Sequence, residues 1–312
     1  MQIFLSSVSL RETIKRSALT VYELPQFVVG QGYAGVEISD RQLGGFSKQN
    51  IERLALCAQE AQCGIVLDIG CDLTLKNQEM WRSEISHALK SIKYAEILGA
   101  PVARISLGGQ AVSIQNLIRR FGSITDKKKK PSVNINPKPT LLKTIIQSQM
   151  VQVAARQVRM SLPTKIAHLQ AKLNRAVEAL RIIAPQSQSC GVNIAIENHW
   201  GITSRPEWIV QIIEGVGHSH LGVCLDFGNF PANVDRYKGI EILAEHAFHA
   251  QAKCWRFDEH GEETSIDFQK IMKVLKEQGY DRIISIEYEG GKQELDACRM
   301  ARDLIQKHWL IS

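Results

Sequence analysis

Three acidic residues each follow directly after a short aliphatic stretch of the chain. They are Glu197 after residues 192–196, Asp226 after 221–225 and Glu287 after 283–286. If these acids converge in a partly dry site, they repel one another and lose hydration, unless they are protonated or bound to a cation. A divalent ion removes that conflict, and hard carboxylate oxygens favour Mn²⁺ or Mg²⁺, with Zn²⁺ and Co²⁺ as further candidates. The sequence therefore predicts a metal site held by the three acids.

Residues 192–199 show how such a site is positioned. Read with a period of two, Val192, Ile194 and Ile196 lie on one face, while Glu197 and His199 lie on the other. A strand with an aliphatic outer face and a polar C-terminal end suits a parallel barrel. There the outer face packs against helices, and catalytic groups project from the strand ends.

The same alternation recurs in the other predicted strands. In 248–254 it places Phe248, Ala250 and Ala252 outside and three polar residues inside. The inward residues near the strand ends are predicted to meet at one mouth. They are Glu37, Asp68, Arg104, Glu197, His199, Asp226, His249, Gln251, Lys253 and Glu287.

Eight strand candidates alternate with helical segments along the chain. The strands are predicted over 2–9, 35–39, 64–68, 101–107, 192–199, 221–226, 248–254 and 282–288. The helices are predicted to end near Gly32 and to span 47–63, 76–98, 164–183, 205–216, 234–247, 267–278 and 294–310. This alternation predicts an α/β fold, a (β/α)8 TIM barrel that forms one domain over residues 1–312. An open doubly wound sheet is the alternative, but no glycine-rich phosphate turn follows the first strand.

The pattern is interrupted after the fourth strand by an insertion over about 109–163. Residues 119–172 contain twelve Lys or Arg and one acid, including the run 127–130, although the whole chain carries only +6. Residues 141–160 have apolar residues at helical spacing. The basic run is interpreted as a solvated loop, or as a lid or oligomer contact near the mouth. A nucleic-acid patch is the least favoured interpretation, because no aromatic residues are interleaved with the lysines.

Composition sets the compartment that we expect. The chain has 312 residues, 44% of them hydrophobic, and its seven cysteines form no C-x-x-C pair. We interpret these cysteines as buried thiols in a reducing compartment, so the cytoplasm is the expected location. The N-terminus lacks the features of a signal peptide, no stretch is long enough to span a membrane, and no membrane partner is expected.

Four segments resemble the strand-five to strand-eight motifs of the xylose isomerase-like TIM barrels, the sugar phosphate isomerase/epimerase family. They are residues 194–199, 225–229, 251–253 and 285–287. The resemblance implies Glu197, Asp226 and Glu287 as metal ligands. The family's usual fourth ligand is a histidine, and here Gln251 takes that place, with His249 as a substitute on the same face. Asn229 likewise stands where the family has a histidine.

The resemblance also implies an activity: a divalent-metal-dependent isomerase or epimerase of a small sugar or keto-sugar. In the resembled epimerases two metal-bound glutamates transfer the proton next to the carbonyl through a metal-stabilised enediolate. Here that pair is expected to be Glu197 and Glu287. Five further residues are substrate-binding candidates: Glu37, Arg104, His199, Lys253 and His249.

Three other functions remain open. A lyase or dehydratase acting on a keto-sugar or inosose would use the same site. A non-catalytic sugar-binding barrel is suggested by the altered fourth ligand. A DNA-repair enzyme similar to endonuclease IV would need a histidine-rich mouth with several zinc ions, and Asn229 and Gln251 replace histidines there. The partner is expected to be a small molecule rather than nucleic acid, and a homo-oligomer is left open.

Overall fold

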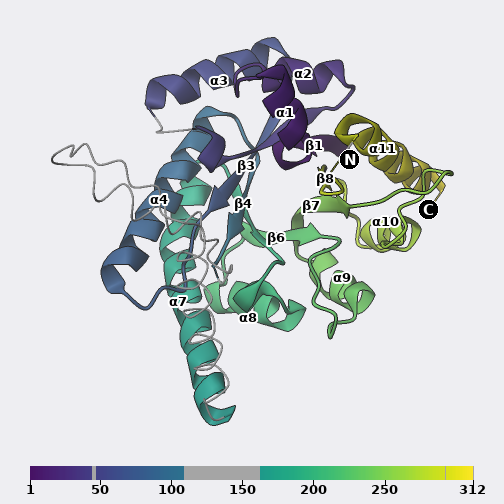
Figure 1. Cartoon of the computed structure of the whole chain (residues 1–312). Helices are drawn as coiled ribbons and strands as arrows, with labels where there is room; N and C mark the ends of the chain where they lie inside the picture. Colours follow the sequence, from purple (N-terminus) through teal and green to yellow (C-terminus); the bar gives the residue numbers. More distant parts are fainter. Residues whose placement is uncertain (44–46, 109–161, 292, 312) are drawn as a thin grey trace, which may run out of the picture. The chain divides into compact units, whose positions relative to one another are not determined.

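Eight parallel strands close into a barrel in the computed structural model (Figure 1). The structure describes residues 1–43, 47–108, 162–291 and 293–311. Each strand pairs with its neighbours in chain order, and β1 pairs in parallel with both β2 and β8. The predicted (β/α)8 barrel is confirmed, and the open sheet is wrong because β1 and β8 close the ring.

The strands are short and regular. They are β1 Gln2–Ser6, β2 Gly35–Ser39, β3 Gly64–Gly70, β4 Val102–Ser106, β5 Asn193–Glu197, β6 Leu221–Asp226, β7 Ala247–Cys254 and β8 Ile283–Tyr288. The predicted strands all form, and most differences from the predicted ranges are of one to three residues at the ends.

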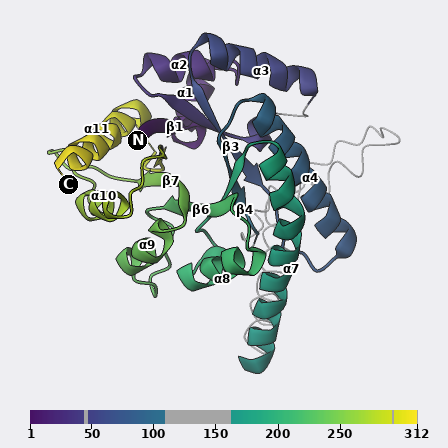
Figure 2. The same cartoon turned by 180° about the vertical axis from the view of Figure 1, so that it is seen from behind.

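Helices lie outside the strands in both views (Figure 2). They are α1 Arg11–Ser17, α2 Leu24–Gly30, α3 Lys48–Glu60, α4 Gln78–Ile97, α7 Leu162–Ser189, α8 Pro206–Val216, α9 Arg236–Ala244, α10 Phe268–Glu277 and α11 Glu294–Ile311. Several begin at a polar side chain that accepts a hydrogen bond from the first turn: Ser47 for α3, Asn77 for α4 and Asp267 for α10. These caps satisfy amide groups that would otherwise have no partner.

The aliphatic faces of the strands are buried under the helices. In β5, Ile194 is 1% exposed and Ile196 is fully buried. Since the inner face is buried as well, the strands are covered on both sides, as expected for a parallel barrel.

The bottom of the barrel is filled by one apolar layer. Its buried members come from six strands: Phe4, Val66, Val102, Ala195, Cys224 and Ile283. Phe4 is the largest of them, and its ring extends across the starts of β2 and β3, where Gly35 and Gly64 leave room. A Cβ atom on Gly64 would lie 2.4 Å from Cζ of Phe4. The ring and the two glycines therefore occupy complementary volumes.

Phe248 packs against this inner layer, although strict alternation places it outside. The pairing of β6 with β7 shifts register here, because Val223 pairs with Ala247 whereas Cys224 pairs with His249. The extra residue on β7 is a bulge, which interrupts the two-residue period at this point. His249 and the residues after it return to the predicted faces.

The chain divides into two compact units. Residues 1–109 and 173–312 form the barrel unit, and residues 110–172 form the second unit. The predicted single domain with an inserted segment stays a prediction. The basic run 127–130 and the predicted helix over 141–160 lie outside the described residues. In the described part of the chain, no helix is long and apolar enough to cross a membrane.

The contact between Phe4 and Gly64 gives a stability prediction. We expect Gly64→Ala to lower the free energy of unfolding by about 1–3 kcal/mol, because the new methyl group overlaps the ring. Phe4→Leu in the same chain should recover part of this loss, so the two effects will not add. Urea unfolding of the single and double variants measures both quantities.

Gly30→Ala is the matched control, since a Cβ atom there meets no atom within 4 Å. We expect that variant to stay within about 0.5 kcal/mol of the parent chain. Additive losses in the Gly64→Ala/Phe4→Leu double variant would contradict the proposed overlap.

Candidate functional site at the barrel mouth

The C-terminal ends of the strands bring the predicted site residues together. Strand register places Asp226 beside Gln251 and Lys253 beside Glu287. Glu197 is the last residue of β5, and Asp226 is the last residue of β6. The mouth is therefore built from residues distant in sequence, as in other barrels of this architecture.

Arg104 on β4 lies inside the barrel and binds three carboxylates. We call Arg104, Glu37, Asp68 and Glu197 the Arg104 cluster. Nε lies 2.9 Å from Glu37 Oε1, and Nη2 lies 2.9 Å from Asp68 Oδ2. Nη1 donates to Glu197 Oε2. Arg104 is only 6% exposed, so its guanidinium is neutralised within the protein and not by solvent.

Two acids of this cluster respond differently to the same arginine. Burial raises the pKa of Glu37, but the charge of Arg104 and a hydrogen bond from His249 outweigh it and lower the pKa to about 2. Burial raises the pKa of Asp68 to about 7, because the opposing effect of Arg104 is weakened by the negative charges of Glu37 and Glu197. Glu37 is thus ionised throughout the neutral range, and Asp68 is the acid that titrates near neutrality.

Lys253 on β7 is the second buried cation of the mouth. We call Lys253, Asp226, Glu287 and Glu289 the Lys253 cluster. The Nζ atom lies 2.6 Å from Glu287 Oε2, 3.5 Å from Glu289 Oε1 and 3.8 Å from Asp226 Oδ2. Burial opposes the charge on Lys253, but Asp226 and Glu287 raise its pKa above the ordinary value, so it remains an ammonium ion.

Asp226 is held by backbone groups on one side only. Its Oδ1 accepts hydrogen bonds from the amides of Gly228 (2.7 Å) and Asn229 (2.8 Å). Its Oδ2 has no hydrogen-bond partner among the described residues, and the side chain is fully buried. Burial raises the pKa of Asp226 well above its usual range, with Glu287 and Glu197 adding to the effect and Lys253 opposing it.

Gln251 and His249 share one acceptor, Glu37. Gln251 Nε2 donates to Glu37 Oε1 at 2.8 Å, and His249 Nε2 lies 3.0 Å from Glu37 Oε2. Both side chains are fully buried. The Oε1 atom of Gln251 has no hydrogen-bond partner among the described residues.

Arg104 and His249 are therefore both bonded to Glu37 beneath the mouth. All three are 6% exposed or less. Their predicted role in substrate binding stays a prediction.

His199 follows β5 at the rim. Its backbone amide donates to the carbonyl and the hydroxyl of Thr203, while its buried Nδ1 has no partner among the described residues. Burial lowers the pKa of His199, which favours the neutral imidazole. The ring of Trp200 meets it edge-on at 5.7 Å, and Trp200 is 56% exposed. The rim thus presents a neutral imidazole beside an exposed indole.

Two asparagines form hydrogen bonds that support Asp226 and Glu197, and the sequence did not predict these contacts. Asn198 donates to the carbonyl of Asp226 (2.9 Å) and accepts from its amide (2.7 Å), so β5 is clamped to β6 at that acid. Asn229 Nδ2 donates to Glu197 Oε1 at 3.1 Å. The signal for Asn198 was its position directly after Glu197, although alternation assigns it to the outer face.

Trp255 and Glu289 also border the mouth. The Trp255 ring covers Gly228, where a Cβ atom would lie 2.4 Å from Cη2 of the indole. Glu289 follows β8 and is one of the three acids near Lys253. Glycine at position 228 is thus required by the close approach of the ring.

The donor chemistry of the mouth fits a divalent cation. The side chains of Glu197, Asp226, Gln251 and Glu287 offer carboxylate and amide oxygens, which Mn²⁺ and Mg²⁺ prefer. Asp226 Oδ2 and Gln251 Oε1 are buried and have no hydrogen-bond partner in the described chain. Their two residues lie opposite each other on the neighbouring strands β6 and β7.

The present side-chain arrangement does not assemble the ligands. Over the described residues, no group of three His, Cys, Asp or Glu is arranged to hold a metal ion. Arg104 and Asn229 occupy both oxygens of Glu197, and Lys253 occupies Oε2 of Glu287. The carboxylates that would hold a metal therefore belong to the two clusters.

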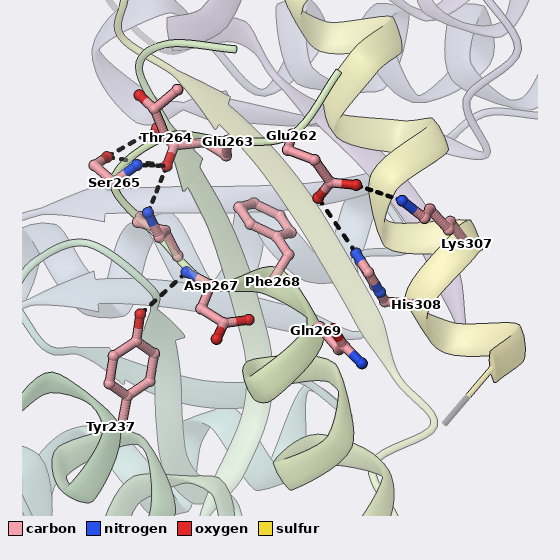
Figure 3. Close-up of a pocket in the computed structure, with 11 residues that line it drawn as sticks. Tyr237, Glu262, Glu263, Thr264, Ser265, Asp267, Phe268, Gln269, Lys307 and His308 are labelled. Carbon is pink, nitrogen blue, oxygen red and sulfur yellow. Dashed lines mark hydrogen bonds and ion pairs between the residues drawn. The ribbon is translucent and has the colours of Figure 1, made fainter. Parts of the chain in front are cut away.

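A cavity of about 600 Å³ lies apart from the mouth, between α9, α10, α11 and the loop before α10 (Figure 3). Many of its polar groups form hydrogen bonds or ion pairs with one another. Glu262 pairs with Lys307, and the hydroxyl of Tyr237 accepts from the amide of Asp267. None of the predicted site residues lines it.

A family model described as "Xylose isomerase-like TIM barrel" matches residues 146–308, which is more than half of the chain. The chain belongs to this family. An uncharacterized protein of Methanocaldococcus jannaschii is 28% identical over 148 residues, covering 43% of this chain and 50% of that protein. The chain thus spans about half the length of this curated relative.

Solved structures of low sequence identity share the fold. D-psicose 3-epimerase from Clostridium cellulolyticum, solved with D-tagatose, superposes with a TM-score of 0.65 at 13% identity, covering 100% of this chain and 98% of the epimerase. The 3-keto-D-glucoside 4-epimerase from E. coli gives a TM-score of 0.65 at 12% identity, covering 98% and 99%. At such identities the likeness shows the fold alone.

The raised pKa of Asp68 makes stability depend on pH. Between about pH 4 and pH 7 the folded chain keeps a proton on Asp68 that the unfolded chain has released, so this group's contribution to stability falls as the pH rises. We expect the free energy of unfolding of the parent chain, minus that of Asp68→Asn, to decrease across this window and to level off above pH 7. Denaturant unfolding at half-unit pH intervals measures it.

Glu259→Gln serves as the control, because it removes one negative charge from a side chain that is 87% exposed. Its difference curve should lack the decrease between pH 4 and pH 7. A flat or rising curve for Asp68→Asn would show that Arg104 outweighs burial at this carboxyl.

Proposed function

We propose that the chain is a divalent-metal-dependent isomerase or epimerase of a small sugar or sugar-derived carbonyl compound. The observation that carries the proposal is the placement of Glu197 and Glu287 at the mouth, each held by a different buried cation. The family membership and the epimerases among the structural neighbours support it.

In the proposed reaction the two glutamates exchange protons with the substrate. One removes the proton from the carbon next to the carbonyl, and the other delivers a proton to the opposite face or to the neighbouring carbon. Proton transfer by positioned carboxylates typically contributes ~10²–10⁴-fold to a rate. Arg104 and Asn229 fix Glu197, and Lys253 fixes Glu287, which keeps each acid oriented before substrate arrives.

Four side chains would hold the metal: Glu197, Asp226, Gln251 and Glu287. When bound, the ion supplies Lewis-acid stabilisation of negative charge on the substrate oxygens. Oxygen ligands alone favour Mn²⁺ or Mg²⁺ over softer ions. Asp226 serves in this proposal as a ligand only.

His199 and Lys253 are the proposed contacts to substrate oxygens. His199 has a buried Nδ1 with no partner in the described chain, and Lys253 carries three donors that can be shared between acids and substrate. Glu37, Arg104 and His249 are proposed to act from below. Arg104 holds Glu197, Glu37 holds Gln251, and His249 contacts Glu37.

A lyase is the second candidate. One structural neighbour is described as a probable dehydratase, with a TM-score of 0.61 at 13% identity. Removal of the same proton followed by loss of a hydroxyl would require no change in the two glutamates. The products formed in the following experiment separate the two candidates.

Exchange of the substrate proton tests the proposal. The Mn²⁺-loaded chain is incubated in D₂O with ketoses, inososes and 3-keto sugars, and deuterium incorporation next to the carbonyl is followed by NMR. We expect exchange with at least one substrate, and a loss of about 100-fold or more in Glu287→Gln, because the acid that moves the proton is gone. Glu259→Gln, at an exposed position, is the control for handling and folding.

Exchange with an epimeric product supports the proposal, whereas an unsaturated product supports the lyase. Binding of sugars without exchange, at equal affinity in Glu287→Gln, would favour a binding barrel. If no sugar exchanges or binds, the assignment to sugar chemistry is wrong.

The charge of the mouth predicts which substrates are preferred. In the described part of the chain, the two clusters place six carboxylates around two cations, so the mouth keeps an acidic excess. We expect kcat/KM for a neutral keto-sugar to exceed that of its phosphate ester by about 10-fold or more, because the phosphate is repelled. The difference should shrink as salt is added. Preference for the ester at low salt would contradict this reasoning.

A further inference from the structure

Glu37 is the residue on which three donors of the barrel interior converge. It accepts from Arg104 Nε at 2.9 Å and from Gln251 Nε2 at 2.8 Å, and His249 Nε2 lies 3.0 Å from its second oxygen. Glu37 is 1% exposed, so solvent does not compete for these contacts. A carboxylate offers only acceptors, and therefore the group facing it must be a donor.

This requirement decides which end of the Gln251 amide faces Glu37. If the amide were turned over, its carbonyl oxygen would face the carboxylate, and two acceptors would meet in a buried space. With Nε2 on Glu37, the oxygen Oε1 is directed away from that carboxylate. It is buried and has no hydrogen-bond partner among the described residues. Only this oxygen can coordinate a cation, because the amide nitrogen has no free lone pair.

We propose that Glu37 is a positioning residue that orients the amide of Gln251 and so presents its Oε1 as the fourth ligand of the metal. The inference rests on the proposed metal-dependent function and deepens it. Asp226 is the register partner of Gln251 and supplies a second buried oxygen without a hydrogen-bond partner in the described chain. Glu37 acts through Gln251 and does not itself touch the metal.

The chemical consequence is a preference among metals. An imidazole nitrogen at this position suits Zn²⁺ and Co²⁺, whereas a neutral amide oxygen suits the harder Mn²⁺ and Mg²⁺. The oriented amide therefore biases the site toward hard ions. Carboxylate partners that orient metal ligands typically change metal affinity by about 10–100-fold when they are removed.

Mn²⁺ binding by the full chain, followed by electron paramagnetic resonance and calorimetry, tests the role of Glu37. In Glu37→Gln the new amide can donate to Oε1 of Gln251 and hold that oxygen away from the metal. We expect Mn²⁺ to bind about 10–100-fold more weakly, with an altered resonance spectrum. In the Gln251→Ala background the same Glu37→Gln change should alter the affinity by less than about 3-fold, because the amide it orients is absent.

Asp68→Asn is the matched control for disturbance of the Arg104 cluster. It removes a different partner of the same guanidinium, and within the described residues no hydrogen bond joins Asp68 to Gln251. We expect its loss of Mn²⁺ affinity to be clearly smaller than that of Glu37→Gln, because Gln251 keeps its partner. Equal losses of affinity in Glu37→Gln and Asp68→Asn, or equal effects of Glu37→Gln with and without Gln251, overturn the inference.

Gln251→His keeps the test decisive if Glu37→Gln does not fold. One ring nitrogen can donate to Glu37 while the other binds the metal, so the ratio of Zn²⁺ to Mn²⁺ affinity should rise about 10-fold or more. An unchanged ratio means that residue 251 is not a ligand, and the inference is wrong. If the parent chain binds no Mn²⁺, the metal-dependent function itself fails. If Mn²⁺ binds equally well to the parent chain and to Glu37→Gln, only the role of Glu37 fails.

Discussion

The ion pairs of Arg104 inside the barrel are the interaction on which the rest of the mouth depends. A buried guanidinium is stable only where carboxylates surround it, and a buried carboxylate needs the cation in turn. Glu37, Asp68 and Glu197 come from β2, β3 and β5, so one side chain of β4 links four strands. Hydrogen bonds from Gln251 and His249 to Glu37 extend the linkage across the barrel to β7. The Arg104 cluster, Gln251 and His249 thus form one hydrogen-bonded network inside the barrel.

The second cation gives the mouth its division into two parts. Lys253 holds Glu287, whereas Arg104 holds Glu197, so the two acids proposed to transfer protons are supported by different cations. Gln251 stands between the two parts, because it donates to Glu37 in one cluster and is the register partner of Asp226 in the other. Gln251 therefore contacts one cluster through its side chain and the other through strand pairing.

Alternation along the strands predicted which side chains of the mouth point into the barrel, but not how far along the barrel axis each one lies. The sequence placed Glu37, Arg104, Gln251 and Lys253 on the inner face, and their contacts with one another agree with this. Depth depends on the stagger of neighbouring strands, which a two-residue period does not contain. For this reason the sequence suggested Glu37 and Arg104 as substrate contacts, whereas in the structure they are bonded to buried groups of the protein.

Two other features were beyond the reach of a simple period. Phe248 packs against the inner apolar layer because a bulge in β7 adds one residue at that point. The neighbouring residue types give no sign of this bulge. Asn198 lies on the outer face by alternation, yet it clamps the backbone of Asp226 just beyond the end of β5. The period fails where the strand ends, and polar side chains at strand ends are therefore best examined for bonds to the neighbouring strand.

Charge balance explains why the acids and the cations of the mouth occur together. The sequence alone suggested that converging carboxylates require a metal, but Arg104 and Lys253 already supply two positive charges at the same place. They do not neutralise the site, since six carboxylates surround them and burial raises the pKa of both Asp68 and Asp226. The remaining demand for positive charge is concentrated at Asp226, whose second oxygen lies 3.8 Å from Lys253 and accepts no hydrogen bond from the described chain. A cation that binds beside this oxygen would therefore have to compete with the ammonium group of Lys253.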